Sequence, residues 1–131
     1  MAEHNILGKR GEIAAARYLV THGYNIVAQD WHHGHRDIDI IATKLGVMVF
    51  VEVKTRSSEE YGTPEESVDD EKIRNILEAA HAYVCMNKIE MALRFDIIAV
   101  VSDGNSFRIK HYPDAFNAHH WTPNYFKEER W

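Results

Sequence analysis

The chain has 131 residues, 45% of them hydrophobic, which is sufficient for one globular domain with its own core. It has no apolar run near the roughly 20 residues that a membrane-spanning helix needs, and its amino-terminal residues do not form a signal-peptide pattern. A single cysteine, Cys85, excludes an internal disulfide and fits the reducing cytoplasm. The formal net charge of −5 argues against a generic basic nucleic-acid-binding domain, although local basic surfaces stay possible.

The first predicted element is a helix over residues 6–22, which Gly23 would end. Glu12 falls inside the stripe that we expect to be buried, where a carboxylate is unfavourable without a partner. That partner could be Arg10 or Arg17 in an ion pair, or a metal site that uses Glu12 as a third acid. The residues of the stripe follow three-and-four spacing: Gly8, Gly11, Ala15, Tyr18 and Leu19.

Next, residues 24–29 predict a strand and residues 31–36 a loop. Residues 37–43 and 47–55 then predict a β-hairpin, because both runs are rich in Val and Ile and Leu45-Gly46 can form the turn between them. The second strand of this hairpin is largely apolar on both faces. We therefore expect it to be a central strand that is covered on both sides.

The register of this hairpin would bring acidic residues together. A two-residue turn pairs Lys44 with Val47, and counting outward places Asp39 opposite Glu52, where like charges destabilise the sheet unless a cation lies between them. Lys54 follows Glu52 by two residues and points to the same face. A four-residue turn would place Asp37 there instead, and a three-residue loop would reverse the face. A solvated face, or a salt bridge to Lys54, is the alternative explanation for these acids.

After a polar loop over residues 57–66, a second helix is predicted over residues 69–86, with Ser67 and Asp70 as a capping box. Lys72 lies at the border of its buried face, where it could reach the sheet edge or remain in solvent. Cys85 would be a small core residue of this helix. The buried face itself comprises Ile73, Ile76, Leu77, Ala80 and Val84.

Strands are predicted over residues 94–101 and 106–112, joined at Asp103-Gly104. The tail over residues 113–131 carries five aromatic residues, so we expect it to pack on this domain or on a second subunit. The order of helix, three strands, helix and two strands predicts an α/β fold: one mixed sheet flanked by helices, in a single domain over residues 1–131. The aromatic residues of the tail are Phe116, Trp121, Tyr125, Phe126 and Trp131.

This order of elements, with Glu12, Asp39 and Glu52-x-Lys54 in place, resembles the PD-(D/E)xK nuclease superfamily, whose restriction-endonuclease-like core is αβββαβ. Nearly the whole chain is similar to the YraN-like family of bacterial proteins, which resembles archaeal Holliday-junction resolvases. The chain has Arg36-Asp37 where that family usually has Gly-Glu. The matching segments are 8–12 with Ala15 and Tyr18-Leu19, 37–41, 49–56, Lys72 and 94–98.

The resemblance implies a role for each of these site residues. Asp39, Glu52 and the Val53 carbonyl would bind Mg²⁺ or Mn²⁺, ions that prefer such all-oxygen ligands. Lys54 would orient the attacking water or stabilise developing negative charge. Glu12 would complete the acidic cluster, and Lys72 would contact the scissile phosphate. The substrate would be branched or structured DNA, and a homodimer would suit symmetric cutting of two strands.

Two alternatives to a nuclease remain at this stage. One is a non-catalytic DNA-binding or repair-accessory module on a nuclease fold, which the acidic net charge favours. The other is a zinc or nickel protein, although the histidine spacing matches no standard zinc module and there is no cysteine pair. The histidines concerned are His32, His33, His35, His119 and His120.

Overall fold

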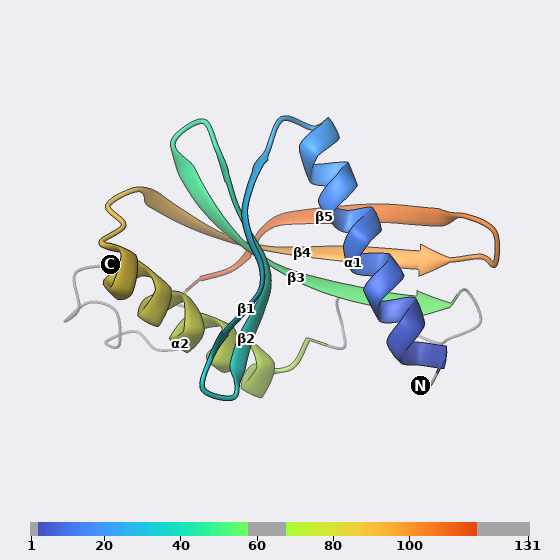
Figure 1. Cartoon of the computed structure of the whole chain (residues 1–131), viewed down its shortest axis with the longest axis horizontal. Helices are drawn as coiled ribbons and strands as arrows, with labels where there is room; N and C mark the ends of the chain where they lie inside the picture. Colours follow the sequence, from blue (N-terminus) through green and yellow to red (C-terminus); the bar gives the residue numbers. More distant parts are fainter. Residues whose placement is uncertain (1–2, 58–67, 118–131) are drawn as a thin grey trace.

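The computed structural model describes residues 3–57 and 68–117, which form a five-stranded sheet between two helices (Figure 1). The strands follow one another in the order β1-β2-β3-β4-β5, and only the β3–β4 pair is parallel. The predicted α/β fold with a single mixed sheet flanked by helices is therefore confirmed. The elements are α1 (Glu3–Thr21), β1 (Asn25–His33), β2 (Arg36–Lys44), β3 (Val47–Ser57), α2 (Asp70–Asn87), β4 (Ala92–Ser102) and β5 (Phe107–Phe116).

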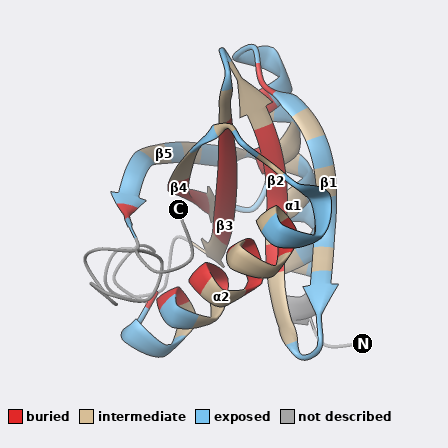
Figure 2. Ribbon diagram, turned by 90° about the vertical axis from the view of Figure 1, so that its left-hand side faces the viewer, coloured by how far each residue is buried: buried red, intermediate tan, exposed pale blue. Residues whose placement is uncertain are grey.

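Two hydrophobic clusters lie on opposite faces of the sheet, and each is covered by one helix. Ala15 and Leu19 of α1 pack with alternate residues of β3 such as Val51. On the other face, Ile76 and Leu77 of α2 pack with Phe50, the residue next to Val51. β3 is buried on both faces (Figure 2), so the prediction of a central strand is confirmed.

The β2–β3 hairpin has the predicted two-residue turn. Leu45 and Gly46 have φ angles of 50° and 79°, as the two central residues of a hairpin turn of type I′ require. Lys44 pairs with Val47, so the register is the one expected from the sequence.

Several sequence-based boundaries were wrong. Residues 31–36 are not a loop: β1 continues to His33, β2 begins at Arg36, and Gly34-His35 forms a tight turn. An ion pair between Arg36 and Glu78 of α2 holds the turn end of this hairpin against the helix. β1 is half exposed, and its polar residues hid the strand pattern.

At α2, the N-cap is Asp69, whose side chain accepts a hydrogen bond from the backbone N–H of Lys72 at 2.9 Å. Cys85 is exposed and is not a core residue. The start of the predicted tail belongs to β5, and Phe116 is buried beside Phe95. Ser67, from the predicted capping box, lies outside the described residues, as do residues 118–131 of the tail.

A buried polar network ties β4 to β5 and to Tyr24, which lies between α1 and β1. Asp96 is fully buried and accepts hydrogen bonds from Arg94 Nε and Nη2 at 2.9 and 2.8 Å, while His111 Nε2 lies 2.6 Å from its Oδ2 atom. Arg94 also donates to the hydroxyl of Tyr24 at 2.6 Å. Burial opposes ionisation of Asp96, but His111 and Arg94 outweigh it and lower the pKa of this carboxyl. Asp96 is therefore a structural anion with satisfied partners.

Neither described helix could cross a bilayer, because neither is long and apolar enough.

Candidate metal centre

Asp39 lies where β2 separates from β3. The described β2–β3 ladder ends at the pair Ile40–Val51, and the same register would continue to Asp39 and Glu52. Side-chain alternation also breaks at this point, because Ile38 joins the core under α2 while Ile40 joins the core under α1. Figure 1 shows the β1–β2 hairpin diverging from β3. The carboxylate of Asp39 thus occupies a gap between two strands that no longer exchange backbone hydrogen bonds.

The backbone of Val53 faces this gap. Its N–H donates a hydrogen bond of 2.8 Å to Oδ2 of Asp39. In a β-strand the N–H and C=O groups of one residue leave the chain on the same side. The Val53 carbonyl is therefore directed toward Asp39, as a metal ligand at this position would have to be.

Glu52 is the buried carboxylate of the site. It is only 4% exposed, and its Oε1 atom has no hydrogen-bond partner. Burial raises the pKa of Glu52 well above its ordinary value, and the charge of Asp39 raises it further. Burial also raises the pKa of Asp39, which the hydrogen bond from Val53 partly offsets. Two neighbouring carboxylates that are both hard to ionise are expected where a cation normally supplies the compensating charge.

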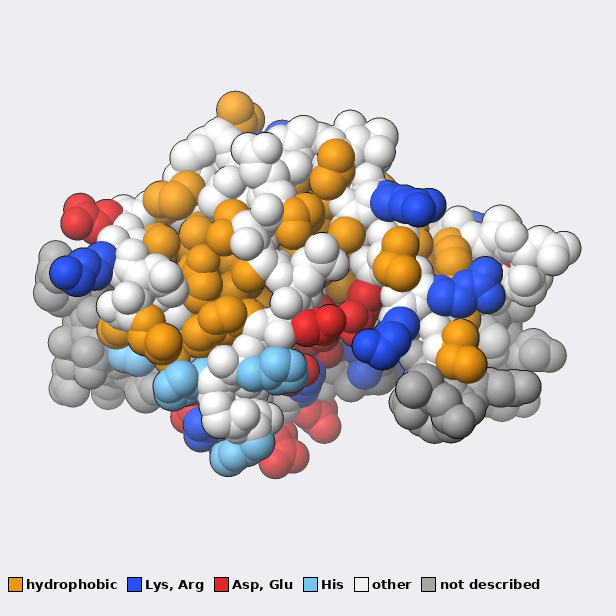
Figure 3. Space-filling model, in the orientation of Figure 1, with side chains coloured by type: hydrophobic (Ala, Val, Ile, Leu, Met, Phe, Trp, Pro, Cys, Tyr) orange, Lys and Arg blue, Asp and Glu red, His pale blue; other side chains and the backbone are white. Residues whose placement is uncertain are grey.

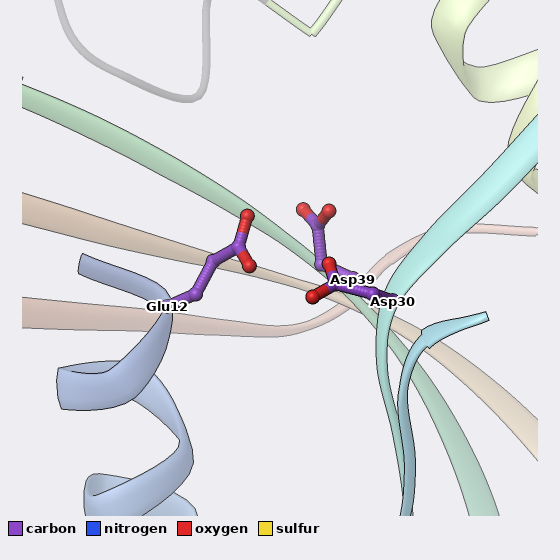
Figure 4. A group of neighbouring side chains, drawn as sticks. All are labelled: Glu12, Asp30 and Asp39. Carbon is purple, nitrogen blue, oxygen red and sulfur yellow. The ribbon is translucent and has the colours of Figure 1, made fainter. Parts of the chain in front are cut away.

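A third and a fourth acid lie on the α1 side of Asp39. Carboxylate oxygens of Glu12, Asp30 and Asp39 all lie within 4.8 Å of one another, close enough to share one metal ion. Figure 4 shows Glu12 reaching from α1 toward the two aspartates, which come from β1 and β2. Glu12 thus meets the acids, whereas Arg10 and Arg17 line a groove against β5.

The acids affect the ionisation of Glu12 directly. Burial, the negative charges of Asp39 and Asp30, and a hydrogen bond with Asp30 together raise the pKa of Glu12 from 4.5 to about 7, although Lys9 acts in the opposite direction. Without a cation, Glu12 is therefore partly protonated at neutral pH.

Two lysines lie on the other side of the site, around a hollow of about 360 Å³. Lys72 Nζ lies 3.5 Å from Oδ1 of Asp37 and 3.9 Å from Oε2 of Glu52. Burial lowers the pKa of Lys72, but the charges of Glu52, Asp37 and Asp39 outweigh burial and raise it, so this ammonium stays charged. Lys54 lines the same hollow beside Glu52, on the face that the strand alternation predicted.

The structure places the side chains predicted for the site on the two sides of Asp39. Glu12 lies beside Asp39 on the α1 side of the sheet. Glu52 neighbours Asp39 on the other side, where Lys54 and Lys72 line the same hollow. Asp37 does not face Glu52 across the hairpin but pairs with Lys72.

Asp30 is the acid that the sequence interpretation missed, because the first strand was ended at Gln29. In the β1–β2 ladder Gln29 pairs with Ile40 and Trp31 with Ile38, so Asp30 lies opposite Asp39. Extending both strands to a two-residue turn at Gly34-His35 would have placed Asp30 opposite Asp39.

The histidine hypothesis gains no support from the described residues. His32, His33 and His35 are exposed around the β1–β2 turn, and none joins a group of metal-binding side chains within residues 3–57 and 68–117. His119 and His120 lie outside this range.

Comparison with known proteins identifies the family. A UPF0102 protein of Bacteroides thetaiotaomicron is 49% identical over 116 residues, which cover 88% of this chain and 96% of that protein. Related proteins of Flavobacterium psychrophilum and Phocaeicola vulgatus are 45% and 41% identical, over 88% and 92% of this chain and 98% and 100% of their own lengths. The family's pattern matches residues 11–100, which include every site residue named above. The chain belongs to the uncharacterised protein family UPF0102.

Proposed function

We propose that this protein is a metal-dependent endonuclease that hydrolyses phosphodiester bonds in structured or branched DNA, on a fold of the PD-(D/E)xK nuclease type. The observation that carries the proposal is Glu52, a buried carboxylate with a free oxygen beside a second carboxylate, Asp39. Lys72 lies 3.9 Å from the other oxygen of Glu52 and offsets part of the charge of this pair, but it leaves Oε1 without a partner.

The residues present fit a hard divalent cation. Asp39, Glu52 and the Val53 carbonyl would supply oxygen ligands, which suit Mg²⁺ or Mn²⁺ and not zinc. Glu12 and Asp30 would complete the acidic shell on the α1 side. When bound, such an ion polarises a phosphodiester and makes water a stronger nucleophile at neutral pH.

The protein's own side chains account for the rest of the chemistry. Lys72 is held beside Glu52 and remains charged, so its ammonium can bind a phosphate oxygen and stabilise negative charge that develops during hydrolysis. Lys54, on the same hollow, can orient the attacking water. Hydrolysis joins a water oxygen to phosphorus, breaks the P–O bond to the leaving nucleotide and gives that oxygen a proton.

Cleavage assays test this proposal. A labelled four-way junction, a flap and a linear duplex are incubated with the protein and Mg²⁺, Mn²⁺ or EDTA, beside the variant Glu52→Gln. We expect metal-dependent cutting of at least one structured substrate, and its loss in the variant. DNA binding without cutting under all of these conditions would contradict the nuclease and favour a non-catalytic DNA-binding or repair-accessory module.

A further inference from the structure

A second hollow lies on the other side of α1 from the acids, against strand β5. Its volume is about 400 Å³. In Figure 3, Lys and Arg side chains alternate with hydrophobic ones on the side of the molecule where α1 lies. The groove is lined by Arg10, Ile13, Ala14, Arg17, Phe107 and Ile109.

Helix geometry separates this groove from the acidic centre by the width of α1. Arg10, Ile13 and Arg17 follow three-and-four spacing, so they share one face of the helix. Glu12 follows Arg10 by two residues, or about 200° around the helix axis, and points to the opposite side. A chain bound in the groove would need only to cross α1 to reach the acids.

The groove combines two cations with an apolar floor. Ile13 is 53% exposed, and Phe107 and Ile109 of β5 are partly exposed beside it. The guanidinium carbon of Arg10 lies 5.8 Å from the centre of the Phe107 ring. No acidic side chain of the described residues lines this groove. Its occupant should therefore be an anion that also carries flat apolar groups.

We infer that this groove binds an unpaired nucleic-acid strand, with phosphates on Arg10 and Arg17 and a base against Phe107. Single strands present both anionic phosphates and exposed base faces, whereas the bases of a duplex are already stacked on one another. The inference rests on the proposed function and narrows it to substrates with a single-stranded segment, such as flaps. An acidic peptide would match the arginines but would leave the apolar floor without flat groups to cover it.

Binding measurements in EDTA separate this inference from cutting. Fluorescence anisotropy compares a labelled single strand, a flap and a blunt duplex, for the wild type and for Arg10→Gln, Arg17→Gln and Phe107→Leu. Arg108→Gln is the matched control, because Arg108 is exposed on β5 between Phe107 and Ile109 and so points to the other face of the strand.

We expect the single strand and the flap to bind more tightly than the duplex. Phe107→Leu should weaken single-strand binding at least about fivefold, as the removal of one stacking platform does. In a plot of log K against log salt concentration, each groove arginine variant should make the slope less steep, by about 0.7 for each phosphate that the protein no longer neutralises. Arg108→Gln should change neither quantity.

An equal weakening in Arg108→Gln would overturn the inference, because charge alone would then explain the binding. An oligoglutamate that competes as strongly as the oligonucleotide would also overturn it. If the wild type binds through the groove but never cuts, the nuclease proposal is contradicted and the assignment of the groove as a single-strand site is supported. If the wild type cuts and the groove variants also bind and cut normally, the assignment of the groove is contradicted and the nuclease proposal is supported.

Discussion

Glu52 is a buried carboxylate that combines three unfavourable features for an ordinary structural residue. It is nearly inaccessible, one of its oxygens has no hydrogen-bond partner, and it neighbours the carboxylate of Asp39. Asp96 has even less exposure, yet its oxygens are bonded to Arg94, His111 and the backbone N–H of Asp114. The contrast separates Asp96, a structural anion with satisfied partners, from Glu52, for which we propose a ligand.

Replacing Glu52 by glutamine should stabilise the metal-free protein while it abolishes cutting. The amide removes the repulsion with Asp39 at nearly the same volume, so in EDTA the melting temperature should rise by roughly 3–5 °C, the shift that about 1 kcal/mol causes in a domain of this size. Asp96→Asn is the control, since it breaks a satisfied buried network and should lower the melting temperature. A fall of several degrees in Glu52→Gln, with cutting retained, would show that Glu52 is structural.

Lys72 should matter for cutting, whereas Arg74 of the same helix should not. Lys72→Gln removes the ammonium that lies near Glu52 and Asp37, and we expect cutting to slow about 10²- to 10³-fold, as the removal of one charge-stabilising group does. Arg74→Gln on the exposed side of the same helix turn should leave the rate unchanged. Single-turnover rates measure both, and equal effects in the two variants would contradict a specific role for Lys72.

At the scale of elements, the contact of α1 with β3 determines where Glu12 lies. Gly11 is buried against Thr55, and a Cβ atom added to Gly11 would lie 2.0 Å from the Oγ1 atom of Thr55. The close approach that glycine allows brings the next residue, Glu12, within reach of Asp39.

Gly11→Ala should therefore push α1 away from the sheet. We expect it to destabilise the protein by about 1–3 kcal/mol, the usual effect of overpacking, and to weaken metal binding. Gly8→Ala is the matched control: nothing lies within 4 Å of a Cβ atom there, so it should stabilise the helix by about 0.5–1 kcal/mol. Urea unfolding and metal titration report the two effects, and similar results for both variants would contradict the tight-contact explanation.

The sequence predicted the elements whose signals are local. Leu45-Gly46 specified the turn, and the turn specified the register that brings Asp39 and Glu52 together. The contact of Lys72 with the site was only one of two alternatives, because it depends on how α2 packs. Asp30 was missed because the ladder that places it opposite Asp39 joins two strands, of which β1 has mostly exposed residues. The separation of β2 from β3 at Asp39 has no sequence signal of its own.

At the scale of the whole molecule, the two helices place different chemistry on the two sides of one gap in the sheet. α1 contributes Glu12, and α2 contributes Lys72 from the opposite face. Because the sheet opens between β2 and β3, both faces reach the same carboxylate, Asp39. The acids of this centre thus contribute part of the net charge of −5, and a bound cation would offset that part.

Stability should consequently depend on pH and metal together. The pKa of Glu12 is about 7 in the folded protein and 4.5 ordinarily, so the folded state binds more protons between these values. The free energy of unfolding of the metal-free protein should therefore fall as the pH rises from about 4.5 to 7.

Added Mn²⁺ should reverse this trend, because the ion replaces the bound protons. We expect it to raise the melting temperature more at about pH 8 than at about pH 5.5. The variant Glu12→Gln should show a smaller dependence of stability on pH in EDTA. Equal stabilisation by Mn²⁺ at both pH values would contradict proton–metal competition at these acids.

We propose that Asp39 and Glu52 together hold a divalent cation. Isothermal titration calorimetry of Mn²⁺ into the wild type, Glu52→Gln and Arg74→Gln tests it most directly. We predict saturable binding with proton release in the wild type and in Arg74→Gln, and no such binding in Glu52→Gln. Binding of equal affinity in Glu52→Gln, or no binding by the wild type at millimolar Mn²⁺, would contradict the assignment of this site as a metal centre.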